Sequence, residues 1–544
     1  MKKKTAIWLP FIIAISIVLG ICIGRFYHQA STIGSRIFAK QNKIESLLGI
    51  IQSQYVDTVN INNLVEGAMH KIIGELDPHS AYIPAKDLLS VNEELEGSFS
   101  GIGIQFSVLN DTITVVSVIP GGPSEKAGIL PGDKIVTIND TVFVGKNVEP
   151  MDKVMKKLRG LKDSKVDLGI KRSSAKKLLT FTITRGDIPV NSVDVSFKIN
   201  DKTGYLKISK FGRNTYNEFM NALAKLRKEG ADRYIIDLRG NTGGYMDAAI
   251  KMVNEFLPKD QLIVYTEGKA FPRSEGNEAY SDGTGAFQNN QIVVLMDEWS
   301  ASASEIFAGA IQDNDRGMII GRRSFGKGLV QQQIPFSDGS AIRLTIARYY
   351  TPSGRSIQKE YKMGDIEDYN QDLMNRFLHG EFDTKDSIKL NDSLSYETRN
   401  ERIVYGGGGI MPDIFVPRDT IGVTSYLNNV VNNGIIYQFA LEYTNNHRQE
   451  LSQFKDYGNL LKYLKRKPLL DEFVTYAASK GVKPRPVYIN ISRKIINNQL
   501  HAYIARNLLG DEAFYPILML EDKTFLKAVD ILDENKGFPE IPNK

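Results

Sequence analysis

The sequence predicts a multidomain α/β protein, and three observations lead to this fold class. At roughly 150 residues per domain, the 544 residues allow about three or four domains. The spacing of apolar residues changes along the chain, from helical before residue 96 to short strands over 97–187, strand–helix alternation over 192–417 and helices over 420–544. A hydrophobic content of 42% supplies enough apolar residues for large cores.

Composition and charge exclude several classes of function. The single cysteine, Cys22, rules out an internal disulfide, a cysteine zinc site and a redox pair. The net charge of +5, from 68 basic and 63 acidic residues, gives no electrostatic footprint for nucleic acid. The six histidines are scattered and form no His-x-x-x-His pair. We therefore expect no metal, no other cofactor and no nucleic-acid partner.

The N-terminus predicts a membrane segment over residues 1–26. Lys2–Lys4 precede an uncharged run, Ala6–Gly24, whose 19 residues are just long enough to cross about 30 Å of hydrocarbon as a helix, and Arg25 ends it. The positive-inside rule keeps the lysines in the cytoplasm. We expect an uncleaved signal-anchor in the inner membrane, with the body of the protein in the periplasm.

Two other interpretations of this segment remain open. A cleaved signal peptide needs a small-x-small site, which Gly20-Ile21-Cys22 fits only by half. A lipid anchor at Cys22 favours a small preceding residue, and Ile21 is bulky. All three interpretations place the body of the protein outside the cytoplasm.

Residues 40–96 read as a helical region, because apolar residues recur every three or four positions from Ile44 to Tyr55. Asp77-Pro78-His79-Ser80 interrupts the pattern, and a short helix is expected around Leu88–Leu95.

Residues 97–187 form a small β-rich unit with strands predicted at Ile102–Phe106 and Thr112–Val118. A turn and short helix follow, then more strands and a helix over Met151–Leu158. The unit resembles a PDZ domain in the segments Gly101–Ile104, Pro123–Gly128 and Leu130–Ile135.

The PDZ resemblance implies a site for peptide C-termini. Backbone N–H groups of Ile102, Gly103 and Ile104 can hold a terminal carboxylate, and the peptide then adds as a strand beside Gln105–Val108. The implied peptide-binding residues are Ile102, Gly103, Ile104 and Gln105. The alternative is an ordinary tight turn built on the same glycines.

Residues 192–417 alternate between strands and helices, as expected of α/β layers, with a polar insertion at about 359–402. The run Gly321–Lys327 almost matches a phosphate-binding P-loop. Gly328 stands where a P-loop has Ser or Thr for magnesium, and the following residues alternate as in a strand. Nucleotide binding is therefore excluded. Residues 420–544 read as mainly helical.

The segment Trp299–Glu305 joins an apolar strand to a helix and carries three serines. At such a turn a serine hydroxyl stands near helix N–H groups that stabilise negative charge. A nucleophilic serine needs a base, and a buried lysine is the usual alternative to histidine. These considerations leave Ser300, Ser302 and Ser304 open, and helix capping is the common use of such serines.

A family resemblance distinguishes among the three. The segments Ser300–Ala310 and Gly326-Lys327-Gly328 are similar to the carboxyl-terminal processing (tail-specific) serine proteases. That family has a Ser–Lys dyad with a supporting Gln at separations of 25 and 4, which Ser302, Lys327 and Gln331 meet.

Other segments extend the resemblance to about residues 40–417. Asp237–Gly244 matches the family's Asp-Leu-Arg-x-Asn-x-Gly-Gly, with Thr242 replacing a commoner Pro or Gly. Asp77–Tyr82 and Gly409–Asp413 match further signatures. The resemblance implies an α/β core of the crotonase/Clp type and says little about residues 420–544.

The resemblance also implies the roles of the site residues. Ser302 attacks the scissile carbonyl, neutral Lys327 accepts the proton, and Gln331 orients Lys327. The oxyanion hole comes from the Ala303 N–H and the N–H of Gly243 or Gly244, with the choice of glycine open. Glu305 is expected either to balance helix charge or to make an active-site hydrogen bond, and Asp237 and Arg239 to position the glycine loop.

The predicted function is an envelope-anchored serine endopeptidase whose PDZ domain captures apolar C-terminal tails of proteins and peptides. A second copy of the chain or an adaptor protein is a further expected partner. Two alternatives are a peptide-binding scaffold with an inactive core and an acyl-CoA-type enzyme. The complete Ser302–Lys327–Gln331 set argues against the scaffold, and the PDZ-like unit argues against the acyl-CoA enzyme.

Overall fold

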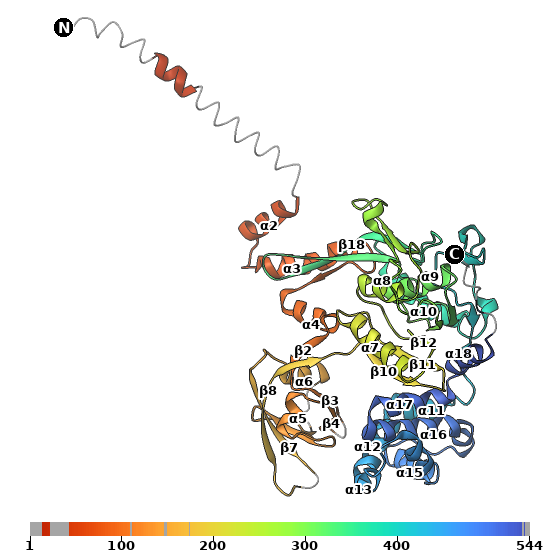
Figure 1. The fold of residues 1–544 in the computed structure, drawn as a ribbon. Coiled ribbons are helices and arrows are strands. Elements are labelled where there is room, and N and C mark those ends of the chain that lie inside the picture. Colours follow the sequence, from red (N-terminus) through yellow and green to blue (C-terminus); the bar gives the residue numbers. More distant parts are fainter. Residues whose placement is uncertain are drawn as a thin grey trace, which may run out of the picture. The chain divides into compact units, whose positions relative to one another are not determined.

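The structure, a computed structural model, describes residues 14–21, 43–108, 111–145, 150–172, 175–535 and 538 (Figure 1). The chain divides into two compact units, residues 1–75 and 76–544. The first unit contains helices α2 (Lys43–Gln54) and α3 (Ile61–Gly74). The Asn60 side chain caps α3 by accepting a hydrogen bond from the Asn63 N–H at 3.3 Å.

The predicted membrane segment lies mostly outside the described residues. Residues 14–21 are helical, and the rest of 1–26 is not described. Among the described helices, none combines the length and the apolar character that a membrane crossing requires. The anchor therefore gains no support here and stays a prediction.

The second unit begins with strand β1 (Ala81–Ile83) and helix α4 (Ala85–Glu96). The Asp77 carboxylate accepts hydrogen bonds from the backbone N–H groups of His79 and Ser80, both at 2.9 Å. This Asx turn ends the preceding helical pattern and aligns β1 beside β18 (Ala341–Tyr350).

The β-rich unit contains a sheet with strand order β3-β4-β5-β7-β8, and β6 pairs with β5. The first and last strands of the unit, β2 and β9, pair with each other in a separate antiparallel ribbon. One apolar core fills the unit. The bounds are β2 Ser98–Gly101, β3 Ile104–Val108, β4 Ile113–Val118, α5 Pro123–Ala127, β5 Lys134–Ile138, β6 Thr141–Val142, α6 Met151–Leu158, β7 Lys165–Lys171, β8 Leu179–Thr184 and β9 Gly186–Pro189.

The main sheet of the α/β core has the order β10-β11-β12-β15-β16-β21, and its strands from β11 onward run parallel. Helices α7, α8 and α9 cover one face and C-terminal α18 covers the other (Figure 1). The bounds are β10 Val193–Lys198, β11 Thr203–Ile208, α7 Thr215–Lys228, β12 Arg233–Asp237, α8 Met246–Asn254, β15 Gln291–Met296, α9 Ala303–Asp313, β16 Met318–Gly321, β21 Ile414–Phe415 and α18 Lys523–Glu534.

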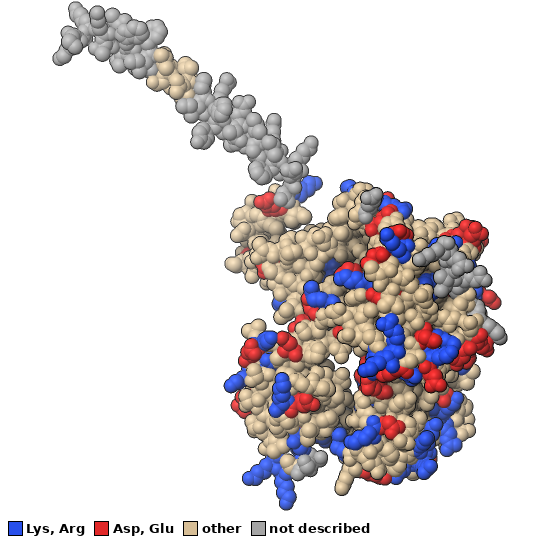
Figure 2. Space-filling model, viewed as in Figure 1, with Lys and Arg blue, Asp and Glu red and all other residues tan. Residues whose placement is uncertain are grey.

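A second sheet, β1-β18-β13-β14 with β17 on β18, borders the core. Its remaining strands are β13 (Leu262–Glu267), β14 (Glu278–Tyr280) and β17 (Leu329–Pro335). The P-loop-like run leads into strand β17 and not into a helix, which confirms the strand expected after Gly328. Basic and acidic side chains are interspersed on the face of the second unit shown in Figure 2.

The predicted insertion at 359–402 is ordered and packed. Its helix α10 (Ile366–Leu378) buries Tyr369 and Arg376. Around it lie η3 (Lys385–Ser387), η4 (Asp392–Leu394), β19 (Ser395–Glu397) and its partner β20 (Ile403–Tyr405).

The C-terminal region is helical, as expected, and has a core of its own. Its helices are α11 Ser425–Asn432, α12 Ile435–Asn446, α13 Arg448–Leu451, α14 Tyr457–Leu464, α15 Leu469–Ser479, α16 Pro486–Leu509, α17 Asp511–Leu518 and η5 Met519–Glu521, ahead of α18.

Candidate active site

Ser302 lies at the sharp turn between β15 and α9, immediately before the helix. Its backbone has φ +56° and ψ −114°, a conformation that a residue with a side chain adopts rarely. Strained backbone of this kind gathers at functional sites, where the surrounding packing maintains it. The turn leaves the Ser302 side chain partly exposed at the N-terminal end of α9.

Ser300 and Ser304 are fully buried and serve the fold. The Ser300 hydroxyl donates to the Leu238 carbonyl at 2.9 Å, and the Ser304 hydroxyl donates to the Asn241 carbonyl at 2.9 Å. Both therefore secure the loop that follows β12. Of the three serines left open by the sequence, only Ser302 lines the cavity described below.

Glu305 ties the segment of Ser302 to the segment of Lys327. One carboxylate oxygen accepts the N–H groups of Ser302 at 2.8 Å and Lys327 at 2.9 Å. The other accepts the Gly326 N–H at 2.7 Å and the Ser324 hydroxyl at 2.5 Å. Burial raises the pKa of Glu305, and these hydrogen bonds to its charged form oppose the rise. Glu305 thus caps the N-terminus of α9 through the Ser302 N–H and also clamps the backbone of Lys327, so both of its alternative roles have a contact in the structure.

Tyr349 of β18 makes a second connection between the same two segments. Its buried hydroxyl lies 2.5 Å from the Lys327 carbonyl oxygen and 3.1 Å from the Ser302 carbonyl oxygen. Burial holds the pKa of Tyr349 well above its ordinary value, so the hydroxyl stays protonated as a donor. No motif in the sequence marks Tyr349 as a site residue.

Lys327 and Gln331 lie together at the start of β17. The Lys327 amino group donates to Gln331 Oε1 at 3.2 Å, and Gln331 Nε2 donates to the His79 carbonyl at 2.5 Å. The second bond fixes the amide so that its oxygen faces the lysine. Burial lowers the pKa of Lys327, and the nearby positive charge of Arg343 lowers it further. Both effects favour the neutral amine.

His79 contributes to the site through its backbone carbonyl, which accepts the hydrogen bond from Gln331. The His79 side chain lies 2.7 Å from the Tyr369 hydroxyl, in α10. Burial and the charge of Lys327 lower the pKa of His79 to about 4, so the ring is neutral near pH 7. In the sequence, His79 stands out only as part of the signature segment Asp77–Tyr82. Its hydrogen bond with Gln331 could not be predicted, because it depends on the pairing of distant strands.

The glycine loop packs directly against Ser302. A Cβ atom on Gly243 would lie 2.7 Å from Ser302 Cβ and 3.0 Å from the Ala303 nitrogen, so only glycine fits, and its φ is +101°. The Gly243 N–H already donates to Asn241 Oδ1 at 2.9 Å. The Gly244 N–H has no acceptor within the described part of the chain.

These residues border one cavity of about 750 Å³. Helix α4 forms one side, and the glycine loop, the start of α9 and strands β17 and β18 form the rest. Arg343, which the sequence analysis also did not identify, lies in its wall. The predicted residues that line it are Gly243, Gly244, Ser302, Lys327 and Gln331, and Ala303 follows Ser302 directly.

The four predicted peptide-binding residues lie in the β-rich unit, at the edge of its sheet. Strand β3 pairs with β4 on one side and with no strand on the other among the described residues. The carbonyls of Ile102 and Gly103 accept the Ser124 and Ile119 N–H groups, each at 3.0 Å. The Gln105 side chain is exposed and accepts the Ser117 hydroxyl at 2.9 Å. A free edge of this kind permits strand addition by a peptide.

Comparison with protein families matches four segments of the chain. Residues 202–368 match peptidase family S41, and residues 100–184 match the PDZ domain. Residues 26–87 match the N-terminal domain of the activating protease CtpB. Residues 426–510 match a family of unknown function.

Several relatives share a large part of the sequence. Carboxy-terminal processing protease CtpB of Bacillus subtilis is 35% identical over 322 residues, which cover 59% of this chain and 66% of that protein. Probable CtpA-like serine protease of Staphylococcus epidermidis is 36% identical over 353 residues, 64% of this chain and 70% of that protein. The match spans 62% of a third relative, from Staphylococcus haemolyticus.

Among solved structures, the photosystem II D1 C-terminal processing protease is 25% identical and covers 68% of this chain, with 91% of its own length matched. The TM-score of this match is 0.35. The sequence relatives, with the S41 and PDZ matches, establish the family. The chain belongs to the carboxy-terminal processing family of serine proteases and carries a PDZ domain ahead of its S41 core.

Proposed function

We propose that this protein is a serine endopeptidase that cleaves proteins and peptides near their C-termini, with Ser302 as nucleophile and Lys327 as base. One observation carries the proposal. Glu305 and Tyr349 bind the backbones of both residues, 25 positions apart in sequence, at the wall of the same cavity. A nucleophile and its base must be held in a fixed geometry, and this double clamp supplies it.

The proposed reaction begins with Ser302 Oγ adding to the scissile carbonyl carbon while its proton passes to the neutral amine of Lys327. Lys327 then protonates the leaving amine as the C–N bond breaks, which leaves an acyl-enzyme. A water molecule, deprotonated by Lys327, hydrolyses the ester and releases the new carboxyl terminus. Gln331 holds the lysine amine in line through its Oε1 atom.

The oxyanion of the tetrahedral intermediate needs two N–H donors. The Ala303 N–H at the start of α9 is one. We assign the second to Gly244, because its N–H has no acceptor within the described residues, whereas the Gly243 N–H is already bound to Asn241. Gly243 serves instead to let the loop approach Ser302.

Substrate tails are proposed to bind the PDZ domain through their terminal carboxylate and to add as a strand to β3. The unpaired edge of β3 and the Ile102–Ile104 turn beside it support this. Main-chain hydrogen bonds would then give affinity, and alternate side-chain pockets a preference for apolar tails.

The location in the cell envelope, with residues 1–26 as inner-membrane anchor and the body in the periplasm, remains a proposal based on the sequence. Membrane fractionation followed by protease treatment of intact spheroplasts tests it, and a protein that stays protected contradicts it. Self-association or binding to an adaptor protein rests on the family resemblance, and sedimentation of the purified protein tests it.

The test of the catalytic proposal uses the full chain in detergent and peptides with free apolar C-termini. Ser302→Ala should abolish cleavage and leave the protein folded, with at most a small fall in unfolding temperature, since the hydroxyl that is removed belongs to the capping box at the start of α9. The control Ser479→Ala alters an exposed serine at the end of α15 and should cleave as the wild type does. Cleavage by Ser302→Ala at the wild-type rate would refute the assignment.

A further inference from the structure

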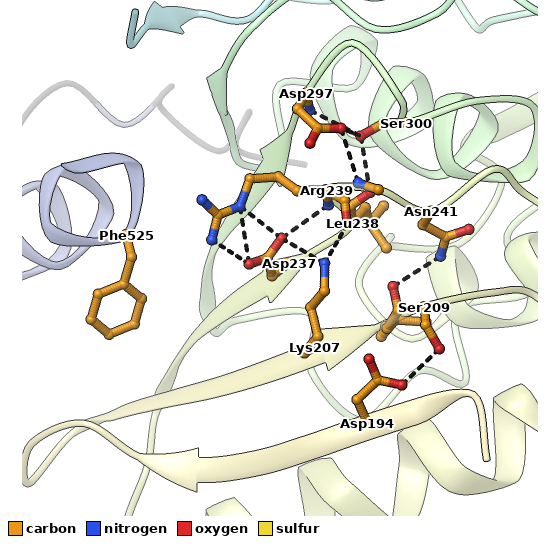
Figure 3. A network of polar contacts seen from close by, with 12 residues as sticks. Asp194, Lys207, Ser209, Asp237, Leu238, Arg239, Asn241, Asp297, Ser300 and Phe525 are labelled. Carbon is orange, nitrogen blue, oxygen red and sulfur yellow. Dashed lines mark hydrogen bonds and ion pairs between the residues drawn. The ribbon is translucent and has the colours of Figure 1, made fainter. Parts of the chain in front are cut away.

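An ion cluster beside the active-site loop links the α/β core to the C-terminal region. Arg239 comes directly before the loop Gly240–Gly244 that packs on Ser302. Its side chain contacts two carboxylates, those of Asp237 and Asp522. Figure 3 shows Arg239 together with Asp237 and Lys207. The Arg239 side chain lies 2.6 Å from Oδ2 of Asp237, the last residue of β12, and 2.7 Å from Oδ2 of Asp522, far along the sequence.

Asp522 is the N-cap of α18, and its two oxygens have separate tasks. Oδ1 accepts the Phe525 N–H at 2.8 Å, which satisfies the first turn of the helix. Oδ2 faces Arg239. Helix α18 itself is fixed to the far face of the main sheet, because Phe525 and its neighbours are buried in the core there.

The cluster is balanced in charge. Lys207 contributes a second positive charge, 3.3 Å from Asp237 Oδ1, and also donates to the Arg239 carbonyl oxygen. Asp237 is almost fully buried. Two cations therefore face two carboxylates, and loss of the Asp522 charge leaves one excess positive charge in a partly buried cluster, although Arg239 keeps its contact with Asp237.

The loop is held from its other side by residues around the nucleophile. The Gly240 N–H donates to Asp297 Oδ1 at 2.9 Å, and Ser300 and Ser304 bind the carbonyls of Leu238 and Asn241. Arg239, directly before Gly240, ties the start of the loop to Asp237 and Asp522. At the other end, the Phe211 N–H donates to the Gly243 carbonyl at 2.9 Å. A shift of Arg239 would therefore move the start of the segment that carries the Gly243 and Gly244 amides.

We propose that Asp522 is a positioning residue for catalysis, which acts through Arg239 to hold the oxyanion loop. The C-terminal helix α18 is then a structural part of the active site, although it contacts no substrate. This inference rests on the proposed function, and it assigns a role to a region outside the recognised S41 and PDZ segments.

The test is Asp522→Asn in the full chain. Asparagine caps a helix as well as aspartate does, so α18 keeps its first turn while the charge facing Arg239 is lost. The matched control is Asp419→Asn, which removes the neighbouring ion pair of α18, between Lys523 and Asp419 at 2.8 Å, and leaves Arg239 untouched.

In Asp522→Asn we expect kcat to fall about tenfold or more, short of the roughly 100-fold or larger loss when an oxyanion donor is removed outright. The affinity for a peptide aldehyde, whose adduct with Ser302 places an oxyanion in the hole, should fall in parallel, while KM changes little. The control should match the wild type in both. Amide exchange of residues 238–245 should be faster in Asp522→Asn only.

An unchanged kcat and aldehyde affinity in Asp522→Asn, together with a lower unfolding temperature, would show a purely structural ion pair and overturn the inference. The exchange measurement does not depend on catalysis. If the wild type cleaves no peptide, the proposed function fails, and unaltered exchange at residues 238–245 in Asp522→Asn would still overturn the inference separately.

Discussion

In the proposed mechanism, the protonation state of Lys327 decides whether the site can work. Lys327→Arg keeps the positive charge but removes the base, because a guanidinium stays protonated in proteins. We predict that Lys327→Arg and Lys327→Ala lose activity equally, by about 1,000-fold or more, as expected for loss of a catalytic base. Peptide hydrolysis by the purified variants measures this.

The control for this substitution is Lys362→Arg, at an exposed lysine, which should keep wild-type activity. Substantial activity in Lys327→Arg would mean that the lysine only provides charge and that another group is the base.

The pH dependence follows from the same side chain. Burial and Arg343 lower the pKa of Lys327, so its neutral, active form grows as pH rises and predominates above that lowered pKa. We predict that kcat/KM rises with pH, levels off below the ordinary lysine pKa of about 10.4, and stays high in the alkaline range. Since the pKa of His79 is lowered to about 4, no histidine inflection near 6.5 is expected. A profile that levels off near pH 6.5 would contradict a lysine base.

Among single residues, the family resemblance, with its separations of 25 and 4, implied Ser302, Lys327 and Gln331 as one set, and all three border the same cavity. Their catalytic roles stay predictions. Spacing could not identify Tyr349 or the His79 carbonyl, because they reach the site through the pairing of β1 and β17 with β18. Such contacts depend on strand register between distant segments, which a single sequence does not specify.

At the element scale, strand β17 presents alternate residues to opposite faces, and this offers a matched pair of variants. Gln331 binds Lys327 and the His79 carbonyl, whereas Gln332 is exposed. We predict that Gln331→Ala lowers kcat about 10- to 100-fold with little change in KM, since it disturbs a base and no substrate contact. Gln332→Ala should have wild-type kinetics. Steady-state peptide hydrolysis by both variants gives the answer, and equal kinetics for the two would remove Gln331 from the mechanism.

Helices and strands with a strong apolar periodicity could be predicted from the sequence. The packing of irregular, polar segments was harder to predict. The apolar strands β12 and β15 and the helix α9 follow from their sequence pattern. The insertion at 359–402 was identified by its polarity alone, yet its helix α10 supplies Tyr369 to the His79 side chain and buries Arg376 against the Ser324 carbonyl. Polar residues that bury themselves by pairing resemble a solvated loop in the sequence.

At the scale of the whole molecule, the PDZ domain is predicted to select substrates by their free C-terminus. Amidation of a peptide's C-terminus removes charge-assisted hydrogen bonds worth about 1–3 kcal/mol. Cleavage at low peptide concentration should then fall about 5- to 150-fold. Rates for matched free-acid and amidated peptides measure the effect, and equal rates on the wild type would refute recognition of the carboxylate.

Mutation of Gly103 cannot replace the comparison of free-acid and amidated peptides. Gly103 has φ +74°, and an added Cβ would lie 3.0 Å from Ile188 Cδ1 and 3.4 Å from Pro123 Cδ. Gly103→Val would therefore strain the domain itself, whatever its effect on the peptide. Changing the peptide leaves the protein intact.

The path of the C-terminal region was beyond prediction from the sequence. Its helical character was correctly expected, but the docking of α18 on the main sheet depends on shape matching between Phe525 and its distant partners around Tyr205. The resemblance that identified the core ends near residue 417. The ion pair between Arg239 and Asp522 joins the core to a residue beyond the part of the chain that the resemblance covers.

The proposed mechanism requires that Ser302, activated by Lys327, is the nucleophile. A serine-reactive fluorophosphonate forms a covalent bond with an activated hydroxyl, and mass spectrometry of the digested protein identifies the modified residue. We predict modification at Ser302 in the wild type and its loss in Lys327→Ala. Modification at Ser300 or Ser304, or undiminished modification of Ser302 in Lys327→Ala, would show that Ser302 is not a nucleophile activated by Lys327.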